Sequence, residues 1–165
     1  MVIERIEAQF PGAILDRHAF RGDATITVSG PRFLEVVDFI FAEGFQLLLD
    51  VTAVDLETPE YRFEVVYHWL NLVNQERLRI KVAVADGASQ PSLVGRFKSA
   101  DWAEREVYDL FGIPFEGHPN LTRLLMWEDF PGHPLRKDFP LDGGDLFCSQ
   151  DIGASFAPEA RSLNA

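Results

Sequence analysis

The sequence is poor in the residues that carry redox and metal chemistry. It holds a single cysteine, Cys148, among 165 residues. One thiol cannot form an internal disulfide, and an iron–sulfur cluster takes about four thiolates. We therefore expect a free thiol in a reducing compartment and no cluster bound by this chain.

Basic residues and long apolar runs are also scarce. The chain has 15 Lys and Arg against 26 Asp and Glu, a formal net charge of -11. Binding to nucleic-acid phosphates needs clustered Lys and Arg, so we expect no nucleic-acid partner. No apolar run approaches the roughly 20 residues that span a bilayer, and the first residues alternate acidic with apolar side chains, unlike a signal peptide. We expect a soluble, cytoplasmic chain that meets a membrane only through another protein.

What is present is the patterning of one α+β domain. An apolar helical face over residues 2–10 ends at Pro11-Gly12, and a second over residues 33–41 ends at Gly44. Alternating or apolar stretches predict five strands, at residues 13–18, 23–29, 45–55, 61–72 and 76–85. The order α-β-β-α-β-β-β predicts a two-layer α+β domain over residues 1–112, with a mixed five-stranded sheet and helices on one face.

The last part of this domain is expected to be helical. Residues 92–97 predict a short helix, and a longer one begins at Ser99 or Asp101 and runs to Phe111, where Gly112 ends it. No strand pattern is evident after Ser99.

Residues 113–165 are predicted to form an extended arm. Between residues 113 and 141 five prolines accompany many large apolar side chains, which a disordered linker would lack. A proline-stiffened arm loses little entropy on docking, and its apolar side chains can be buried against a partner. We therefore expect a docking arm, and we expect a chain cut before Pro114 to stay folded without joining its partners.

Two carboxylates on the predicted helix suggest acid–base catalysis. Glu104 and Glu106 flank Arg105, but residues two positions apart on a helix point to different sides and cannot bracket one bond. Asp101 with Arg105, and Arg105 with Asp109, stand at i, i+4, the spacing of helical ion pairs. A salt-bridged helix is therefore the favoured interpretation.

Histidine and cysteine offer two further kinds of site. The tripeptides Gly117-His118-Pro119 and Gly132-His133-Pro134 suggest metal ligands, but two histidines 15 positions apart without a third ligand match no closed zinc site. Proline biases the residue before it to extended backbone, so both tripeptides favour bends. Cys148 with a histidine is a conceivable nucleophile pair, although its sequence neighbours include no activating cation.

The most specific pattern is the block from Glu104 to Leu141. It resembles the signature of the thirty-kilodalton subunit family of respiratory complex I, which includes the C subunits of bacterial NADH–quinone oxidoreductases and the J subunits of cyanobacterial and plastid enzymes. Thr122, Phe130 and Phe139 depart from the residues usual in that family. The resemblance assigns the signature, and with it a partner interface, to Glu104, Arg105, Glu106, Asp109, Phe111, Gly112, Gly117, His118, Pro119, Arg123, Gly132, His133, Pro134, Leu135, Arg136, Lys137 and Asp138.

The resemblance implies a structural subunit in the peripheral arm of a proton-translocating oxidoreductase. The holoenzyme would pass electrons from NADH through FMN and iron–sulfur clusters to quinone, whereas this chain would bind no cofactor or metal and have no catalytic activity by itself. Its implied partners are the large D subunit of the quinone site and the cluster-bearing B and I subunits, at the cytoplasmic side of the cell inner membrane.

Two alternatives stay open. The same scaffold occurs in plastid or cyanobacterial-type oxidoreductases and, as a homologous domain, in membrane-bound energy-converting hydrogenases, which the sequence barely separates. A stand-alone hydrolase that uses Glu104 and His118 belongs to a different functional class.

Overall fold

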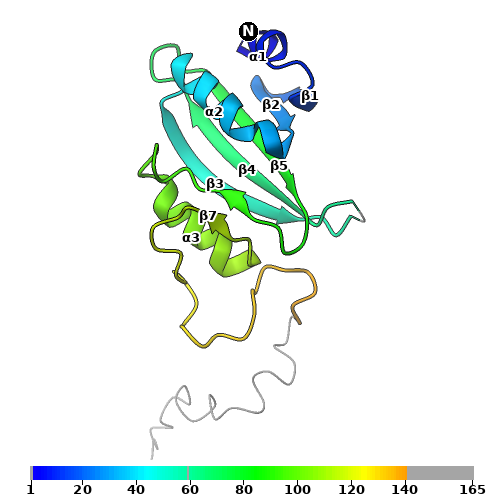
Figure 1. The fold of residues 1–165 in the computed structure, drawn as a ribbon, viewed down its shortest axis with the longest axis vertical. Helices are drawn as coiled ribbons and strands as arrows, with labels where there is room; N and C mark the ends of the chain where they lie inside the picture. Colours follow the sequence, from blue (N-terminus) through cyan, green and yellow to red (C-terminus); the bar gives the residue numbers. More distant parts are fainter. Residues whose placement is uncertain (1, 59, 141–165) are drawn as a thin grey trace, which may run out of the picture.

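The computed structural model describes residues 2–58 and 60–140. The chain runs from the N-terminal helix through the sheet to a helix and an arm beneath it (Figure 1). Its elements in order are α1 (Val2–Gln9), β1 (Ile14–Phe20), β2 (Asp23–Val28), the 3-10 turn η1 (Gly30–Arg32), α2 (Phe33–Ala42), β3 (Leu47–Asp55), β4 (Phe63–Leu70), β5 (Arg77–Val84), β6 (Gln90–Pro91), α3 (Ala100–Phe111) and β7 (Phe115–Glu116).

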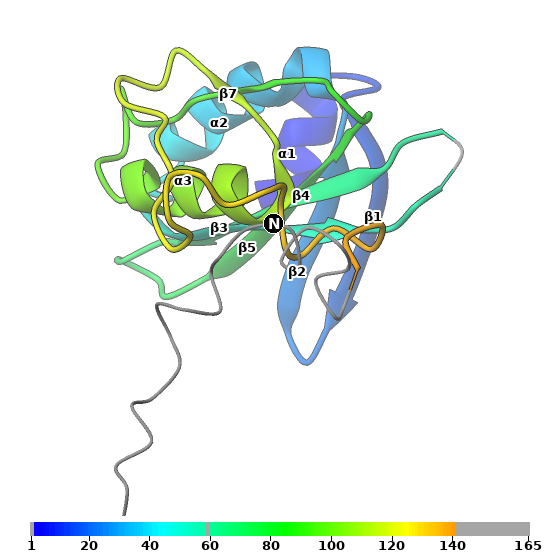
Figure 2. The ribbon, with the colours of Figure 1, turned by 90° about the horizontal axis from the view of Figure 1, so that it is seen from below.

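The main sheet has five strands in the order β1-β2-β5-β4-β3. Strands β2 and β5 pair in parallel and all other neighbours are antiparallel, so the sheet is mixed. Figures 1 and 2 show α1, α2 and α3 on one face of this sheet. The predicted α+β class, mixed sheet and helix placement are therefore confirmed.

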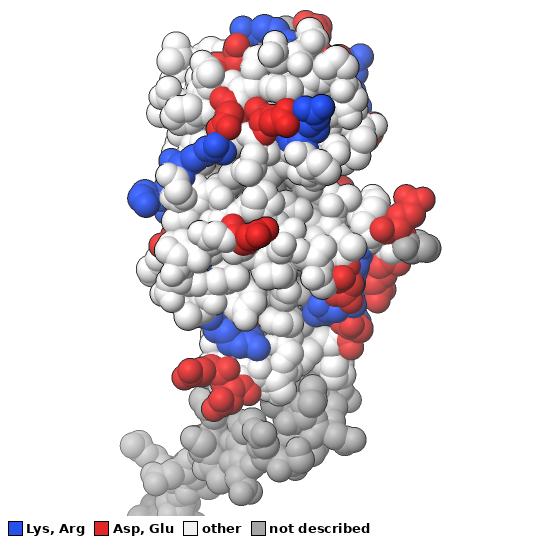
Figure 3. All heavy atoms as spheres, in the orientation of Figure 1, with Lys and Arg blue, Asp and Glu red and all other residues white. Residues whose placement is uncertain are grey.

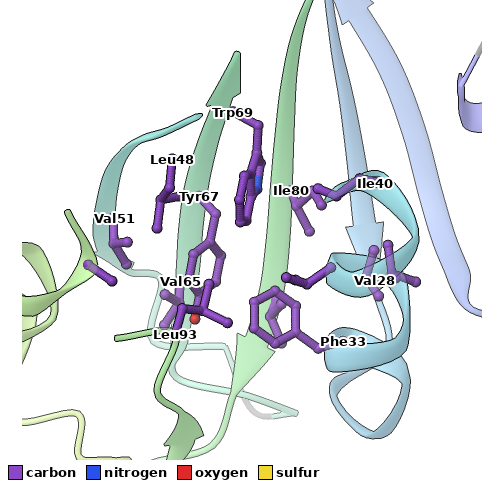
Figure 4. Packing of buried hydrophobic residues seen from close by; sticks show 14 of the residues in the cluster. Val28, Phe33, Ile40, Leu48, Val51, Val65, Tyr67, Trp69, Ile80 and Leu93 are labelled. Atoms are coloured by element: carbon purple, nitrogen blue, oxygen red, sulfur yellow. The ribbon is translucent and has the colours of Figure 1, made fainter. Parts of the chain in front are cut away.

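One hydrophobic core joins the helices to the sheet. On β5, every second side chain from Leu78 to Val84 is buried, as the alternation predicts. Phe33 of α2 packs on Tyr67 of β4 with ring centroids 4.6 Å apart, and Figure 4 shows these side chains turned into the same space as Trp69. Burial of each such side chain contributes about 1.5–3 kcal/mol.

Two local predictions are wrong. Residues 92–97 form a turn and not a helix. The amides of Arg96 and Phe97 both donate to the carbonyl of Leu93, which closes one turn, and the pattern does not continue as a helix. A strand does follow Ser99: β7 pairs in parallel with β6, and the amides of Gln90 and Ser92 donate to the carbonyls of Pro114 and Glu116 at 2.9 Å. Two-residue strands carry too little pattern to be seen in a sequence.

The core continues past the predicted boundary at residue 112. Ile113 and Phe115 are buried in the same cluster as the sheet side chains. Helix α3 lies against β3, and the Ser99 hydroxyl donates to the carbonyl of Leu48 at 2.9 Å. Within residues 2–58 and 60–140, no helix combines the length and apolar character needed to cross a membrane.

Candidate functional site

The signature residues gather around α3. The helix ends where Gly112 adopts a left-handed conformation, with φ of 77°. A Cβ atom at this position would lie 2.6 Å from Cδ2 of His133. Glycine therefore permits both the turn and the close approach of the segment that carries His133.

Glu104 holds the segment before α3. Its carboxylate is fully buried and accepts hydrogen bonds from the Ser92 hydroxyl at 2.6 Å and from the Leu93 amide at 2.7 Å. Burial raises the pKa of Glu104, and the two hydrogen bonds only partly oppose this. The side chain faces its own protein, so its contribution here is to structure.

Asp109 holds a second segment, residues 121–128, in the same way; we call it the loop after α3. Its carboxylate is fully buried, and one oxygen accepts from the amides of Leu124, Leu125 and Met126 at 2.9, 2.7 and 2.9 Å. The other oxygen binds the Arg123 guanidinium at 2.8 Å. Burial alone would raise the pKa of Asp109, but these four donors outweigh it and lower the pKa. The ionised carboxylate therefore fixes the backbone of the loop.

Two arginines hold this loop and the residues after it by donating to backbone carbonyls. Arg105 donates to the carbonyls of Thr122 and Arg123 at 3.1 and 3.0 Å. Arg123 in turn donates to the carbonyls of Phe130 and Gly132 at 2.9 and 3.0 Å.

The predicted ion pairs within the helix are wrong. In the described part of the chain, Arg105 pairs with neither Asp101 nor Asp109, because its guanidinium reaches the loop carbonyls and Asp109 turns to Arg123. The i, i+4 spacing allows such pairs, but Arg105 and Asp109 both bind groups outside the helix instead.

The segment 133–136 covers the C-terminus of α3. The last carbonyls of a helix lack partners within the helix. Here the carbonyl of Asp109 accepts from Nδ1 of His133 at 2.8 Å, and that of Leu110 accepts from the Leu135 amide at 3.0 Å. The carbonyl of Phe111 accepts from Arg136 at 3.4 Å. The guanidinium also places positive charge at the negative end of the helix dipole.

His118 is bound on both sides of its ring. Nδ1 accepts from the Asn120 amide at 3.0 Å, so Nε2 carries the proton and donates to the carbonyl of Asp101 at 3.1 Å. His118 and Glu104 are both buried, and both bind groups of their own chain. No group of three or more His, Cys, Asp or Glu in the described residues is arranged to hold a metal ion. Cys148 lies outside the described residues.

Five charged groups join the end of the arm to the sheet. Arg62 binds Asp55, Asp86 and Asp138 at 3.1, 3.0 and 2.6 Å. Arg136 binds Asp86 and Asp138 at 2.9 and 3.3 Å. The hydrogen bond from Arg62 holds the pKa of Asp138 at about 2. We call these five residues the ionic latch, and Figure 3 shows acidic and basic side chains crowded at the corner where β3 and β5 end.

The latch residues of the sheet were not among the predicted site residues. Arg136 lies 50 positions from Asp86, and the amide of Lys137, which donates to Asp55 at 2.9 Å, lies 82 positions away. No spacing rule connects residues so far apart, so the sequence carries no signal for them.

The arm is folded back on its own domain over residues 113–140. Phe115 and Phe130 are buried, and Phe139 stacks on Phe130 with centroids 5.7 Å apart. The exposed large apolar side chains of the arm are Leu125, Trp127 and Leu135, with exposed fractions of 56%, 49% and 51%. A groove of about 450 Å³ is lined by Tyr108 of α3 and by residues of segment 121–128.

The predicted interface residues therefore differ in exposure. Six of them are half-buried: Arg105, Gly112, Arg123, His133, Pro134 and Arg136. Glu104, Asp109 and Phe111 are buried, and the His118 side chain is buried as well. The exposed members are Glu106, Gly117, Pro119, Gly132, Leu135, Lys137 and Asp138. Whether these exposed residues contact a partner stays a prediction.

Comparisons with known proteins agree with the signature. Residues 26–145 match the family described as the respiratory-chain NADH dehydrogenase, 30 Kd subunit. The C subunit of the NADH-quinone oxidoreductase from Citrifermentans bemidjiense is 43% identical over 145 residues, which are 87% of this chain and 90% of the relative. The protein of the same name from Roseiflexus sp. is 45% identical over 149 residues, 88% of this chain and 86% of the relative.

Solved structures agree with the fold. The structure titled as the trypsin-resistant fragment (1-134) of Nqo5 has a TM-score of 0.64 at 34% identity, and the match covers 73% of this chain and 100% of the fragment. A chain of the membrane-bound sulfane sulfur reductase, an archaeal respiratory membrane complex, has a TM-score of 0.73 at 23% identity over 99% of this chain and 94% of that chain, which shows a shared fold. The chain thus belongs to the family of the thirty-kilodalton subunit of the respiratory-chain NADH dehydrogenase.

Proposed function

We propose that this chain is a non-catalytic structural subunit in the peripheral arm of a proton-translocating NADH–quinone oxidoreductase. The observation that carries the proposal is the use of the signature charges. Glu104, Arg105 and Asp109 bind segments of their own chain around α3. Side chains committed to such contacts are held in place and are not available to a substrate.

The loop after α3 is the proposed docking surface. Asp109 fixes three successive amides of this loop, so little backbone entropy is lost when a partner binds. Leu125 and Trp127 project from it with about half of each side chain exposed. Aromatic and aliphatic anchors on a rigid support are the usual centre of a protein interface. The proposed occupant is a partner subunit with a complementary apolar surface.

The proposal divides the work of the complex among its subunits. The chain itself would hold no cofactor, and the holoenzyme would use FMN, iron–sulfur clusters and quinone. The proposed neighbours are the large D subunit of the quinone site and the cluster-bearing B and I subunits, at the cytoplasmic side of the inner membrane. The names of the relatives support the complex, and the inward-facing charges support the structural contribution.

Substitution of the exposed leucine tests the docking surface. In Leu125→Glu the isolated chain should keep its thermal stability, because the side chain is exposed. The variant should no longer co-purify with the other subunits, since a buried charge at the interface is costly. Val73→Glu is the matched control: Val73 is 92% exposed in the turn between β4 and β5. If Leu125→Glu assembled as well as the control, the loop would not be the docking surface.

A second candidate is the same scaffold in another respiratory membrane complex. The shared fold with a chain of the sulfane sulfur reductase complex favours it, although the identity is 23%. The relatives with 43–45% identity favour the NADH form. The subunits that co-purify with the chain separate the two, because only the NADH form requires an NADH-oxidising subunit.

A further inference from the structure

The last part of the arm is attached to the domain differently from the loop before it. We call residues 133–140 the strap. In the structure the strap has no helix or strand, and turns of Arg136 onto His133 and of Phe139 onto Arg136 shape it. It is attached to the C-terminus of α3, to the ionic latch and, through the ring of Phe139, to Phe130.

The latch is an ion network open to solvent on one side. The side chains of Asp86 and Asp138 are 50% and 52% exposed, whereas those of Arg62 and Arg136 are 15% and 18% exposed. Two guanidinium groups and three carboxylates share the network, so each arginine binds more than one acid. Partly exposed ion pairs are screened by salt, and each contributes little by itself.

The strap and the latch cover an aromatic surface. The guanidinium groups of Arg62 and Arg136 both lie 5.2 Å from the ring centroid of Phe63. Phe63 in turn packs on Phe111 at the end of α3, with centroids 6.4 Å apart. Both rings are buried. Leu135 lies within the strap and is exposed, and its amide is bonded to the carbonyl of Leu110, so the position of the strap determines where this apolar side chain stands.

The loop after α3 is attached by another kind of contact. There a single buried carboxylate, Asp109, binds three backbone amides and Arg123. Such bonds in a buried site are little affected by ions in solution. The arm therefore has one part fixed by buried hydrogen bonds and one part closed by solvent-facing charges.

We propose that the strap is a separately opening cover, closed by the ionic latch over Phe63 and Phe111, while the loop held by Asp109 stays in place. Opening breaks the contacts of Arg136 with Asp86 and Asp138, the bond from the Lys137 amide to Asp55 and the bond from the Leu135 amide to the carbonyl of Leu110. It changes the position of Leu135 without unfolding the sheet. The inference concerns the chain alone and does not depend on the identity of a partner.

Hydrogen exchange measured by NMR on the full chain tests the proposal. The amides of Leu135 and Lys137 report on the strap, and those of Leu124, Leu125 and Met126 are internal references. Raising the salt from about 0.1 to about 1 M shortens the screening length from roughly 10 to 3 Å. We expect exchange in the strap to rise about tenfold relative to the reference amides, with little change in thermal stability.

Variants separate the latch from general charge effects. Arg62→Gln at low salt should reproduce the faster exchange of the strap. Arg62→Lys keeps the charge but not the geometry that binds three acids, so it should give most of the same effect. Arg96→Gln, which removes the exposed pair with Asp38, is the control and should change neither segment. Strap amides that exchange at the rate of the reference amides at both salt concentrations and in Arg62→Gln would overturn the proposal.

Discussion

Asp109 and Arg123 form an ion pair of 2.8 Å in which the carboxylate is fully buried and the guanidinium also holds two backbone carbonyls. The pair connects α3 to the loop that we propose as the docking surface. A signature that suggests contact with a partner thus acts first within its own chain. This relationship leads to predictions about stability that are independent of any complex.

Replacing Asp109 should be among the most damaging single changes. Asp109→Asn removes the charge that pairs with Arg123 and places an amide group against backbone donors. Breaking a buried pair costs about 3–5 kcal/mol in the free energy of unfolding, which urea denaturation measures. Asp38→Asn, at an exposed ion pair, should cost less than about 1 kcal/mol. Equal losses in the two variants would contradict the contribution assigned to Asp109.

The negative charge of Glu104 should not be needed for the stability of the fold. Burial raises its pKa in the folded state above the ordinary value of 4.5, so the folded protein binds this proton more tightly than the unfolded chain does. The stabilising effect is present below pH 4.5 and is lost as the pH rises through the folded pKa. A glutamine at this position can still accept from the Leu93 amide and bond with the Ser92 hydroxyl.

Glu104→Gln should therefore stay within about 1 kcal/mol of the natural protein at pH 7. Glu104→Ala should lose about 2–3 kcal/mol, because the buried Leu93 amide and the half-buried Ser92 hydroxyl lose their partner. Urea unfolding from pH 4 to 8 should show the stability of the natural protein falling relative to Glu104→Gln. A rise with pH would mean that the buried carboxylate is ionised without penalty.

Two glycines with similar backbones should respond differently to alanine. Gly112 and Gly87 have φ of 77° and 75°, so either substitution strains the backbone by about 1 kcal/mol. At Gly112 the new Cβ also meets the His133 ring at 2.6 Å, whereas at Gly87 nothing lies within 4 Å. Gly112→Ala should therefore lower the thermal midpoint well beyond Gly87→Ala and shift the NMR signals of His133. Equal losses in thermal midpoint for the two variants would show that the segment of His133 can move away from a Cβ atom at position 112 at little cost.

Acid should open the latch. The pKa of Asp138 is lowered from 3.8 to about 2, and Arg62 and Arg136 also outweigh burial to lower that of Asp86. A depressed pKa contributes stability that is present above the unfolded value and is lost as the pH falls through the folded value. The amide shift of Lys137, which reports its bond to Asp55, should change between pH 3.8 and about 2. A midpoint above 3.8 would contradict the network.

A chain that ends at Ile113, cut before Pro114, should not unfold cooperatively. It would leave Asp109 buried without its four donors and the last carbonyls of α3 without the strap. It would also lose Phe115 from the core. We therefore predict, in place of the sequence-based expectation, that a cut before Pro114 does not leave a folded domain. A sigmoidal thermal transition of the truncated chain, followed by circular dichroism, would restore that expectation.

The helices and strands whose apolar residues recur at a regular spacing could be predicted from the sequence. Alternation from Leu78 to Val84 marks a strand with one buried face, and the spacing from Phe33 to Ile40 marks a helix with one buried stripe. Glu64 of β4 binds Lys81 of the neighbouring strand β5 at 2.7 Å. Such patterns follow from the geometry of a single element or of adjacent strands.

The candidate site could be predicted from the sequence only in part. The signature marked the block from Glu104 to Leu141 as one unit, and the structure brings the described residues of this block together around α3. The inward direction of its charges was missed, because Asp109 binds an amide 17 positions later and Arg136 a carbonyl 25 positions earlier. Contacts at such separations depend on how the loop returns, which no periodicity encodes.

The most direct test of the structural contribution is turnover per assembled complex. Glu104→Gln and His118→Gln should be introduced together into the intact oxidoreductase, and NADH-to-quinone activity should be divided by the FMN content of the purified complex. Since both side chains are buried and bind their own chain, the account predicts unchanged turnover per FMN, even where less complex assembles. A normal yield of complex with turnover lost would contradict it and place a chemical step in this subunit.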